Sequence, residues 1–369
     1  MNPFKYGMVV SGKDFCGRKA LLKQINDHII SSQRVVVSGE RRVGKTSVVC
    51  EAVHRSKNVR MLYVDLLGIK SVDGMCRRIL KAIVVLEQKT GWLEKIFKTL
   101  AHLRPSISTD PITSLPTVSF DSSIELKADS IPEVFNLIGS LGKKQKIVVV
   151  FDEFQDILNL ANAHEALALL RGEIQFQGET AFIFVGSIRH KMEEIFTKHD
   201  SPFFKSAITL AIDTLSFKEF SEFLKNKFSQ GQRKIDDKVL EKAFQIAENI
   251  PGDIQQLCGA IWETTAEKEM IGVDKLKSAM QLIFAREQKS YENYISLLTN
   301  IQLNVLTAVA KEGGKKVFSA AFMKPSGFTN PSTVRRAVNR LLQLNILFES
   351  SGEYRFVNPF FRAWIIYRG

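Results

Sequence analysis

Hydrophobic residues in the first part of the chain gather in five short runs, at positions 34–38, 59–66, 146–151, 180–185 and 207–212. The runs are rich in valine, isoleucine and phenylalanine and hold few polar residues, which is typical of strands buried on both faces of a parallel sheet. Between them, apolar residues recur at helical spacing, for instance over 19–30 and 72–87. This alternation predicts an α/β fold built on a parallel sheet.

Residues 100–130 do not follow this alternation. They contain Pro105, Pro111 and Pro116, many serines and threonines, and short pieces in which apolar and polar residues alternate. We interpret the segment as an inserted loop or hairpin outside the main sheet.

From residue 215 to about 294 the spacing of apolar residues is helical throughout. The sequence Asn-Ile-Pro-Gly at 249–252 breaks the pattern before a further helix over 254–269. This part of the chain predicts a small α-helical lid that follows the sheet.

The last part of the chain has the pattern of a winged helix. Helices are predicted over 301–310, near 319–323 and over 331–344, and a β-hairpin follows over 346–357. Asn330 is a candidate N-cap for the third helix, with Pro331 at its first position.

This third helix has an apolar face and a basic face. Val334, Val338, Leu341 and Leu342 share the apolar side. The candidate DNA contacts are Arg335, Arg336, Asn339 and Arg340 on the opposite side, with Arg355 on the hairpin. Arginine and asparagine suit DNA phosphates and base edges. A solvated charged surface and a winged helix that binds protein are the alternatives.

The strongest chemical motif follows the first predicted strand. Residues 39–46 fit the pattern G-x-x-x-x-G-K-[ST] of a phosphate-binding P-loop, between a strand and a helix. Lys45 is expected to reach the β- and γ-phosphates, and the Thr46 hydroxyl to hold Mg²⁺. The residues expected to bind the nucleotide here are Gly39, Glu40, Arg41, Arg42, Val43, Gly44, Lys45, Thr46 and Ser47.

Two further strand ends carry candidate catalytic residues. The run 146–151 leads into Asp152 and Glu153, which predicts a Mg²⁺ ligand followed by a residue that orients or deprotonates the attacking water. The run 180–185 leads to Ser187 and Arg189, which are candidates for contact with the γ-phosphate. The alternative in both places is an ordinary polar turn at the end of a strand.

Charge and cysteine content change this picture in two ways. The net charge is +12, and residues 299–369 carry ten Lys or Arg against three Asp or Glu, which indicates a polyanionic partner for the C-terminal domain. Hydrophobic content is 45% and charged content 24%, and no apolar run is long enough for a membrane span. The four cysteines are widely spaced, and the N-terminus has no signal-peptide pattern, so we expect a cytoplasmic protein with reduced thiols.

Together these motifs resemble the archaeal-type P-loop ATPases of the STAND group, which are relatives of the AAA+ origin-recognition initiators. The resemblance implies that Pro3, Phe15, Gly17 and Arg18 line an adenine pocket. It also implies that Pro251 of the lid packs near the nucleotide. Asn249 stands where the family usually has glycine, and Lys205-Ser206 stand where the family segment usually continues to an arginine.

The sequence therefore predicts three domains: a P-loop ATPase domain over 1–213, a helical lid over 214–296 and a winged helix over 297–369. The nucleotide, ATP or ADP with Mg²⁺, is expected at the carboxyl ends of the strands, between sheet and lid. The predicted function is an ATP-dependent molecular switch that hydrolyses ATP slowly and binds duplex DNA. A regulatory scaffold, whose nucleotide stays bound and whose winged helix contacts a protein, is the alternative, and no oligomer is implied.

Overall fold

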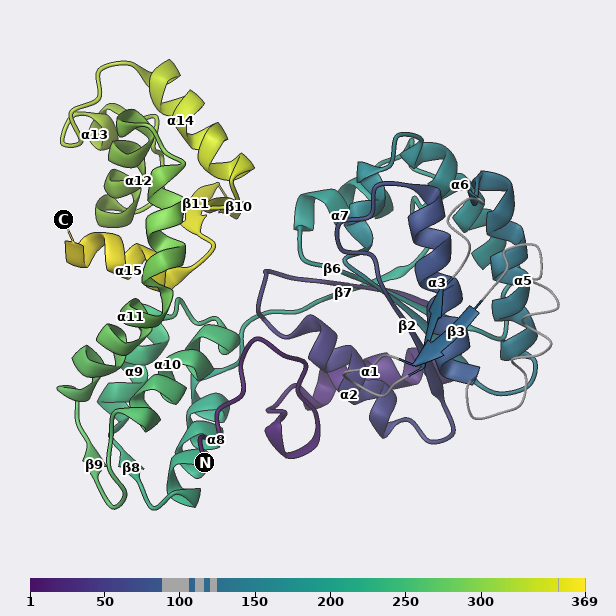
Figure 1. Cartoon of the computed structure of the whole chain (residues 1–369), viewed down its shortest axis with the longest axis horizontal. Coiled ribbons are helices and arrows are strands. Elements are labelled where there is room, and N and C mark those ends of the chain that lie inside the picture. Colours follow the sequence, from purple (N-terminus) through teal and green to yellow (C-terminus); the bar gives the residue numbers. More distant parts are fainter. Residues whose placement is uncertain (88–105, 110–115, 120–124, 351, 369) are drawn as a thin grey trace. The chain divides into compact units, whose positions relative to one another are not determined.

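A computed structural model describes residues 1–87, 106–109, 116–119, 125–350 and 352–368 (Figure 1). The chain divides into two compact units. One unit is Val9–Asp213, and the other joins Met1–Met8 to Thr214–Gly369. Among the helices of the described residues, none combines the length and the hydropathy that a membrane span requires.

The unit Val9–Asp213 is built on a five-stranded parallel sheet in the order β2-β5-β6-β1-β7. The α/β prediction is thereby confirmed. The strands are β1 Arg34–Ser38, β2 Arg60–Asp65, β5 Ile147–Asp152, β6 Ala181–Gly186 and β7 Ile208–Ala211.

The register of these strands brings three polar ends to one edge of the sheet. Asp65 at the end of β2 lies opposite Asp152 at the end of β5, and Ser38 at the end of β1 lies opposite Gly186 at the end of β6. Parallel strands place all their carboxyl ends at the same edge, so the chain segments that follow them are neighbours.

Helices cover both faces of the sheet (Figure 1). On one face, four helices share a single apolar cluster with the strands; they are α3 Val72–Glu87, α5 Ile131–Gly142, α6 Ala163–Gln175 and α7 Arg189–Phe196. On the other face lie α1 Lys19–Ile30 and α2 Lys45–Arg55. Burial on both faces explains why β5 and β6 are apolar along almost their whole length.

Aromatic rings fill the cluster beneath the ends of β5 and β6. Phe154 and Phe184 lie with ring centroids 4.7 Å apart, and Phe196 lies 5.3 Å from Phe184. Phe203 is fully buried and contacts these three rings. The Ser-Pro-Phe-Phe segment at 201–204 therefore has a packing role through Phe203.

The segment 100–130 contains an antiparallel hairpin of β3 Ser106–Thr109 and β4 Pro116–Ser119. These two strands form a sheet of their own, separate from the five-stranded sheet, as the sequence predicts. The remainder of the predicted insertion up to residue 124 lies outside the described residues. The described chain resumes before the short 3-10 helix Ala128–Ser130, which leads into α5.

The lid in the other unit consists mainly of α8 Phe217–Gln230, α9 Asp237–Ile246, α10 Pro251–Glu263 and α11 Lys275–Ser296. It differs from the prediction in two places. A parallel pair of two-residue strands, β8 Lys234–Ile235 and β9 Met270–Ile271, interrupts the helices. The predicted helix over 254–269 is wrong at both ends, because α10 begins at Pro251 and ends at Glu263.

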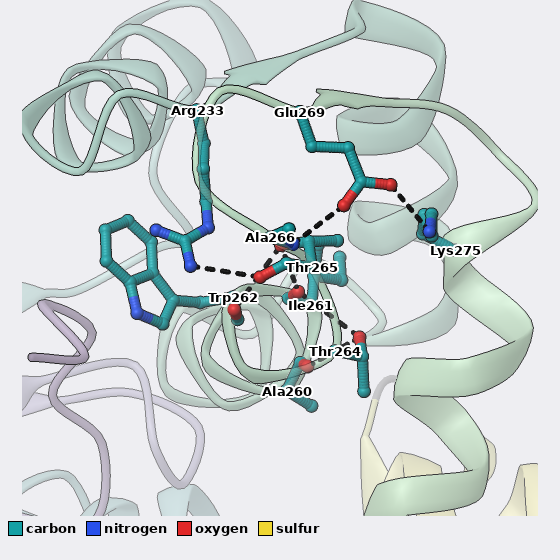
Figure 2. Close-up of polar contacts among 9 residues, drawn as sticks. All are labelled: Arg233, Ala260, Ile261, Trp262, Thr264, Thr265, Ala266, Glu269 and Lys275. Carbon is teal, nitrogen blue, oxygen red and sulfur yellow. Dashed lines mark hydrogen bonds and ion pairs between the residues drawn. The ribbon is translucent and has the colours of Figure 1, made fainter.

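Side-chain hydrogen bonds explain why α10 ends early (Figure 2). The hydroxyls of Thr264 and Thr265 donate to the carbonyls of Ala260, at 3.0 Å, and Ile261, at 2.8 Å. Hydroxyls placed like this compete with the helical hydrogen-bond pattern of the backbone. The Thr265 carbonyl in turn accepts a bond of 3.0 Å from the Arg233 guanidinium.

Figure 2 also shows the contacts of the residues next to β8 and β9 with the end of α10 and its surroundings. Arg233, which precedes β8, lies over the Trp262 ring, 3.9 Å from its centroid. On the β9 side, the Glu269 carboxylate accepts from the Ala266 backbone N–H at 2.8 Å and pairs with Lys275 at 2.6 Å. The residues that make these contacts have no regular separation in the sequence, so hydrophobic periodicity does not predict the contacts.

The first residues of the chain pack on the lid. Phe4 is buried, and its ring lies 4.7 Å from the Phe228 ring. The Asn2 amide donates to the Gly259 carbonyl at 3.2 Å, and the Lys227 ammonium donates to the Pro3 carbonyl at 2.9 Å. Residues 1–8 therefore belong with the lid in space although they precede the sheet in sequence.

The winged helix contains α12 Asn300–Glu312, α13 Ala320–Met323, α14 Pro331–Gln343 and the antiparallel hairpin of β10 Leu347–Ser350 and β11 Glu353–Phe356. Its elements are confirmed as predicted. The Asn330 carboxamide accepts from the Ser332 N–H at 2.9 Å and so caps α14.

A final helix, α15 Pro359–Arg368, was not predicted. It buries Phe360, Phe361 and Trp364, and the Phe361 ring lies 5.0 Å from the ring of Tyr291 on α11. Full burial of a side chain such as phenylalanine stabilises a fold by about 1.5–3 kcal/mol. The C-terminal helix is therefore a strong link between the winged helix and α11.

Candidate nucleotide-binding and DNA-binding sites

The predicted P-loop joins β1 to α2 in a conformation that only a glycine-rich sequence adopts easily. Gly44 has a φ of +88° and is followed directly by Lys45, the first residue of α2. At Gly39, an added Cβ would lie 2.6 Å from the backbone oxygen of Ile212. The loop thus needs glycine at one end for its backbone angle and at the other for close approach.

Lys45 is buried within this loop. Its ammonium donates to the carbonyls of Gly39, at 3.1 Å, and Glu40, at 2.7 Å. Burial lowers the pKa of Lys45 to about 8, while the nearby carboxylates of Glu153 and Asp152 act in the opposite direction. A bound polyphosphate would add negative charge beside this desolvated cation and so favour its charged form.

Asp152, at the end of β5, accepts three hydrogen bonds. Its Oδ2 accepts from the Thr46 hydroxyl and from the Tyr63 hydroxyl, both at 2.7 Å, and its Oδ1 accepts from the Glu153 N–H at 2.9 Å. A threonine hydroxyl beside a carboxylate is the oxygen donor set that Mg²⁺ prefers in P-loop proteins. Thr46 and Asp152 therefore fit the expected metal.

The sequence patterns do not indicate Tyr63 as a site residue. It lies half-buried on β2, and burial together with the hydrogen bond to Asp152 raises the pKa of its hydroxyl far above the usual range. The available signal was its position two residues before the carboxyl end of β2, beside the strand that ends in Asp152. The order of strands in the sheet is needed to use that signal.

We expect Tyr63→Phe to raise the Mg²⁺ concentration needed for half-maximal ATP binding by about tenfold, because partners that orient a metal ligand are worth about 10–100-fold in metal affinity. ADP binding without Mg²⁺ should stay near the parent value. Calorimetric titrations measure the Mg²⁺ midpoint at fixed ATP concentration and the ADP affinity without Mg²⁺. Tyr354→Phe in the winged helix is the matched control, and an unchanged Mg²⁺ midpoint in Tyr63→Phe would contradict the assignment.

Glu153 follows Asp152 with a left-handed backbone, at a φ of +50°. Its Oε2 accepts from the Ser187 hydroxyl at 2.6 Å and from the Gln155 amide at 2.5 Å. Ser187 follows β6, so the ends of β5 and β6 meet through this carboxylate. Arg189, the other candidate at this strand end, begins α7 and is exposed.

The residues expected around the adenine are divided between the two units. Phe15, Gly17 and Arg18 lie in the unit of the sheet, where the Arg18 guanidinium donates to the Val43 carbonyl at 2.7 Å. Gly17 and Arg18 both have a positive φ. Pro3 and Pro251 lie in the unit of the lid, so their place beside a nucleotide stays a prediction.

Pro251 begins α10 after an unusual turn. Glu248 and Asn249 both have left-handed backbones, with φ of +51° and +60°. Asparagine tolerates this conformation better than most residues, which accounts for Asn249 where the family usually has glycine.

The basic face of α14 has the predicted geometry. Val334, Val338 and Leu341 are fully buried. The candidate DNA contacts on this helix are all exposed, namely Arg335, Arg336, Asn339 and Arg340.

Arg355, the fifth candidate DNA contact, is placed differently. It lies on β11, and its guanidinium makes two hydrogen bonds to Glu248 Oε2, at 3.1 and 2.8 Å. Arg362 on α15 pairs with the other carboxylate oxygen at 3.4 Å. In this structure Arg355 therefore joins the winged helix to the turn before Pro251, and it does not lie on the basic face of α14.

The parallel sheet, the P-loop and the acidic end of β5, followed by a winged helix, define a P-loop ATPase fold. Family comparison agrees: a model described as an ATPase domain predominantly from Archaea matches residues 10–257. The chain belongs to this family. A second model, described as a probable winged helix domain, matches residues 289–367. An archaeal-type ATPase with a winged helix, as the motifs predict, is thereby confirmed.

Solved structures show the same fold over nearly the whole chain. A Walker-type ATPase of Pyrococcus abyssi superposes with a TM-score of 0.65 at 15% identity, over 96% of this chain and 97% of that one. The ORC1 protein of Aeropyrum pernix in complex with DNA superposes with a TM-score of 0.51 at 13% identity, over 97% and 94%. At such identities the likeness shows the fold alone. A search of curated proteins found no match.

Proposed function

We propose that the protein is an ATP- and Mg²⁺-dependent molecular switch that hydrolyses ATP slowly and binds duplex DNA through its winged helix. The observation that carries the ATPase part is the gathering of Lys45, Thr46, Asp152, Glu153 and Ser187 at the carboxyl ends of β1, β5 and β6. Membership of an ATPase family supports the same reaction.

Each of these side chains has a distinct part in hydrolysis. Lys45 would bind the β- and γ-phosphates, and Thr46 with Asp152 would hold Mg²⁺, which neutralises charge that develops on the phosphates. Glu153 would accept a proton from, or orient, the attacking water. Ser187, at the end of β6, is a candidate for contact with the γ-phosphate, and its single hydroxyl hydrogen would have to turn from Glu153 to the phosphate when ATP binds. Arg189, exposed at the start of α7, is the second candidate for that contact.

The DNA part of the proposal is supported by the exposed basic face of α14. Three arginines and an asparagine lie on one side of a helix whose other side is buried, and the C-terminal part of the chain carries most of the excess positive charge. The ORC1 relative was solved in complex with DNA, which makes duplex DNA the first partner to test.

The experiment that tests the switch is duplex-DNA binding measured without nucleotide, with ADP and with a non-hydrolysable ATP analogue. A ligand shifts a conformational equilibrium only through its different affinities for the two states, so the three DNA affinities should differ. Equal affinities would contradict the switch. If DNA does not bind in any of the three states, a regulatory scaffold with a protein partner becomes the better interpretation.

Replacing Arg335, Arg336 and Arg340 together by alanine should weaken DNA binding and reduce its salt dependence. For every DNA phosphate that an arginine no longer neutralises, the slope of log affinity against log salt should become shallower by about 0.9. Since all three side chains point away from the buried face, folding and ATP binding should stay unchanged. Fluorescence anisotropy over a salt series measures the effect.

The matched control removes three exposed lysines of the lid, Lys218, Lys238 and Lys242, and so changes the net charge equally. If both triple variants behave alike, only total charge matters, and the face of α14 is not the DNA-binding surface.

A further inference from the structure

Gln155 is a buried polar residue that the proposed reaction does not yet use. It lies in the short 3-10 helix Phe154–Asn159, shortly after Glu153, and only 1% of its surface is exposed. Phe154 and Ile157 on either side are fully buried in the apolar cluster, so the local backbone is fixed by packing. A carboxamide buried this deeply is costly unless its polar atoms are bonded.

The Gln155 carboxamide bonds to two different strand ends. Its Nε2 donates to Glu153 Oε2 at 2.5 Å, and to Asp156 Oδ1 at 3.4 Å. Its Oε1 accepts from the backbone N–H of Ser187 at 3.3 Å. The side chain therefore bridges the expected general base after β5 and the serine after β6.

A glycine in β6 makes room for this bridge. A Cβ added to Gly186 would lie 2.8 Å from Gln155 Oε1 and 2.3 Å from the sulfur of Met192. A side chain at position 186 would therefore force Met192 and the Gln155 carboxamide oxygen to shift.

A carboxamide suits this pair of bonds. It donates through its NH₂ group to a carboxylate and accepts through its oxygen from a backbone N–H. A glutamate of the same size would accept from Ser187 but would repel Glu153. A methionine would fill the space and make neither bond.

We propose that Gln155 is a positioning residue for ATP hydrolysis, which orients the Glu153 carboxylate and the Ser187 turn relative to each other. Both the Gln155 amide and the Ser187 hydroxyl bond Oε2, which fixes the carboxylate rotation and leaves Oε1 for the attacking water. This inference rests on the proposed ATPase function. It predicts that loss of the bridge slows the chemical step and spares nucleotide binding, since the Gln155 carboxamide is already occupied by its protein partners.

The test measures ADP affinity and single-turnover ATP hydrolysis in Gln155→Met and Gln155→Glu. We expect the single-turnover rate of hydrolysis to fall by roughly 100-fold in both variants, because small misplacements of catalytic groups have effects of this size. ADP affinity should stay within about threefold of the parent value. Gln177→Met is the matched control. Gln177 also bonds through its amide, to the Phe135 carbonyl at 3.1 Å, but precedes β6 at the opposite edge of the sheet. The Gln177→Met variant should hydrolyse ATP at the parent rate.

Glu153→Gln separates the two hypotheses. If Glu153→Gln stops hydrolysis while both Gln155 variants hydrolyse as the parent does, the positioning role is overturned and the ATPase proposal stands. If the parent does not turn over, the ATPase proposal fails and this inference with it. If Glu153→Gln hydrolyses at the parent rate, the general base lies elsewhere, and the positioning role is overturned while the ATPase proposal stands. Loss of ADP affinity in both Gln155 variants would assign the residue to folding of the site and would also overturn the proposal.

Discussion

Lys45→Ala should lose about 100-fold or more of the affinity for Mg-ATP while the protein stays folded. Lys45 is the cation inside the P-loop, and a charge-assisted bond in a desolvated site contributes about 1.5–3 kcal/mol, with a further electrostatic share from the second phosphate. Burial already lowers the pKa of Lys45 to about 8 in the absence of ligand, so its removal also relieves a desolvation cost in the folded protein. Isothermal titration with Mg-ATP measures the loss.

Lys57→Ala is a suitable control, because Lys57 is an exposed lysine just after the P-loop helix. It should bind Mg-ATP as the parent does. Unchanged affinity in Lys45→Ala, with a normal circular dichroism spectrum, would contradict the assignment of residues 39–46 as the phosphate-binding loop.

Glu153→Gln should keep nucleotide bound and reduce turnover by about 10²–10⁴-fold, the usual contribution of a general base. The amide oxygen of the new side chain can still accept from Ser187 and Gln155, so the local structure should persist. The amide cannot take a proton from water. Single-turnover hydrolysis beside a binding titration separates the two effects.

Glu179→Gln removes an exposed carboxylate at the amino end of β6 and serves as the control. A parent-like rate in Glu153→Gln would mean that the base lies elsewhere and that Glu153 is a polar turn residue.

Local sequence was sufficient to predict the fold and the candidate phosphate-binding residues that the structure brings together. The P-loop pattern, the apolar run before Asp152 and the strand ending before Ser187 depend on residues adjacent in the chain, and each signal can be seen without knowing what packs against it. Helix periodicity likewise predicted the bounds of α1 and α3.

What the sequence did not predict depends on contacts between distant residues. Tyr63 and Gln155 matter because of what their side chains reach, and neither belongs to a pattern of spacing. The short strands β8 and β9 have two residues each, too few for any periodicity. Helix α15 was missed because its many aromatic residues leave little contrast between an apolar and a polar face.

Arg355 illustrates the same limit for charged residues. On the sequence alone it is one more cation in a basic domain, and DNA is the natural partner to expect. The structure provides a protein partner, Glu248, whose side chain is mostly buried. Sequence can count charges, but it cannot tell which of them the protein itself neutralises.

The pairing of Glu248 with Arg355 and Arg362 also bears on how a movement of the lid could reach the winged helix. The carboxylate lies in the turn directly before Pro251, and its two partners come from the wing hairpin and from the last helix. A pivot of the winged helix on the lid would separate both ion pairs and leave a mostly buried carboxylate without its counter-charges. The ion pairs of Glu248 and the packing of Tyr291 on Phe361 and Trp364 therefore both connect the lid to the winged helix. If nucleotide binding rotates α10, as the proposed switch requires, these contacts would carry the basic helix α14 with it.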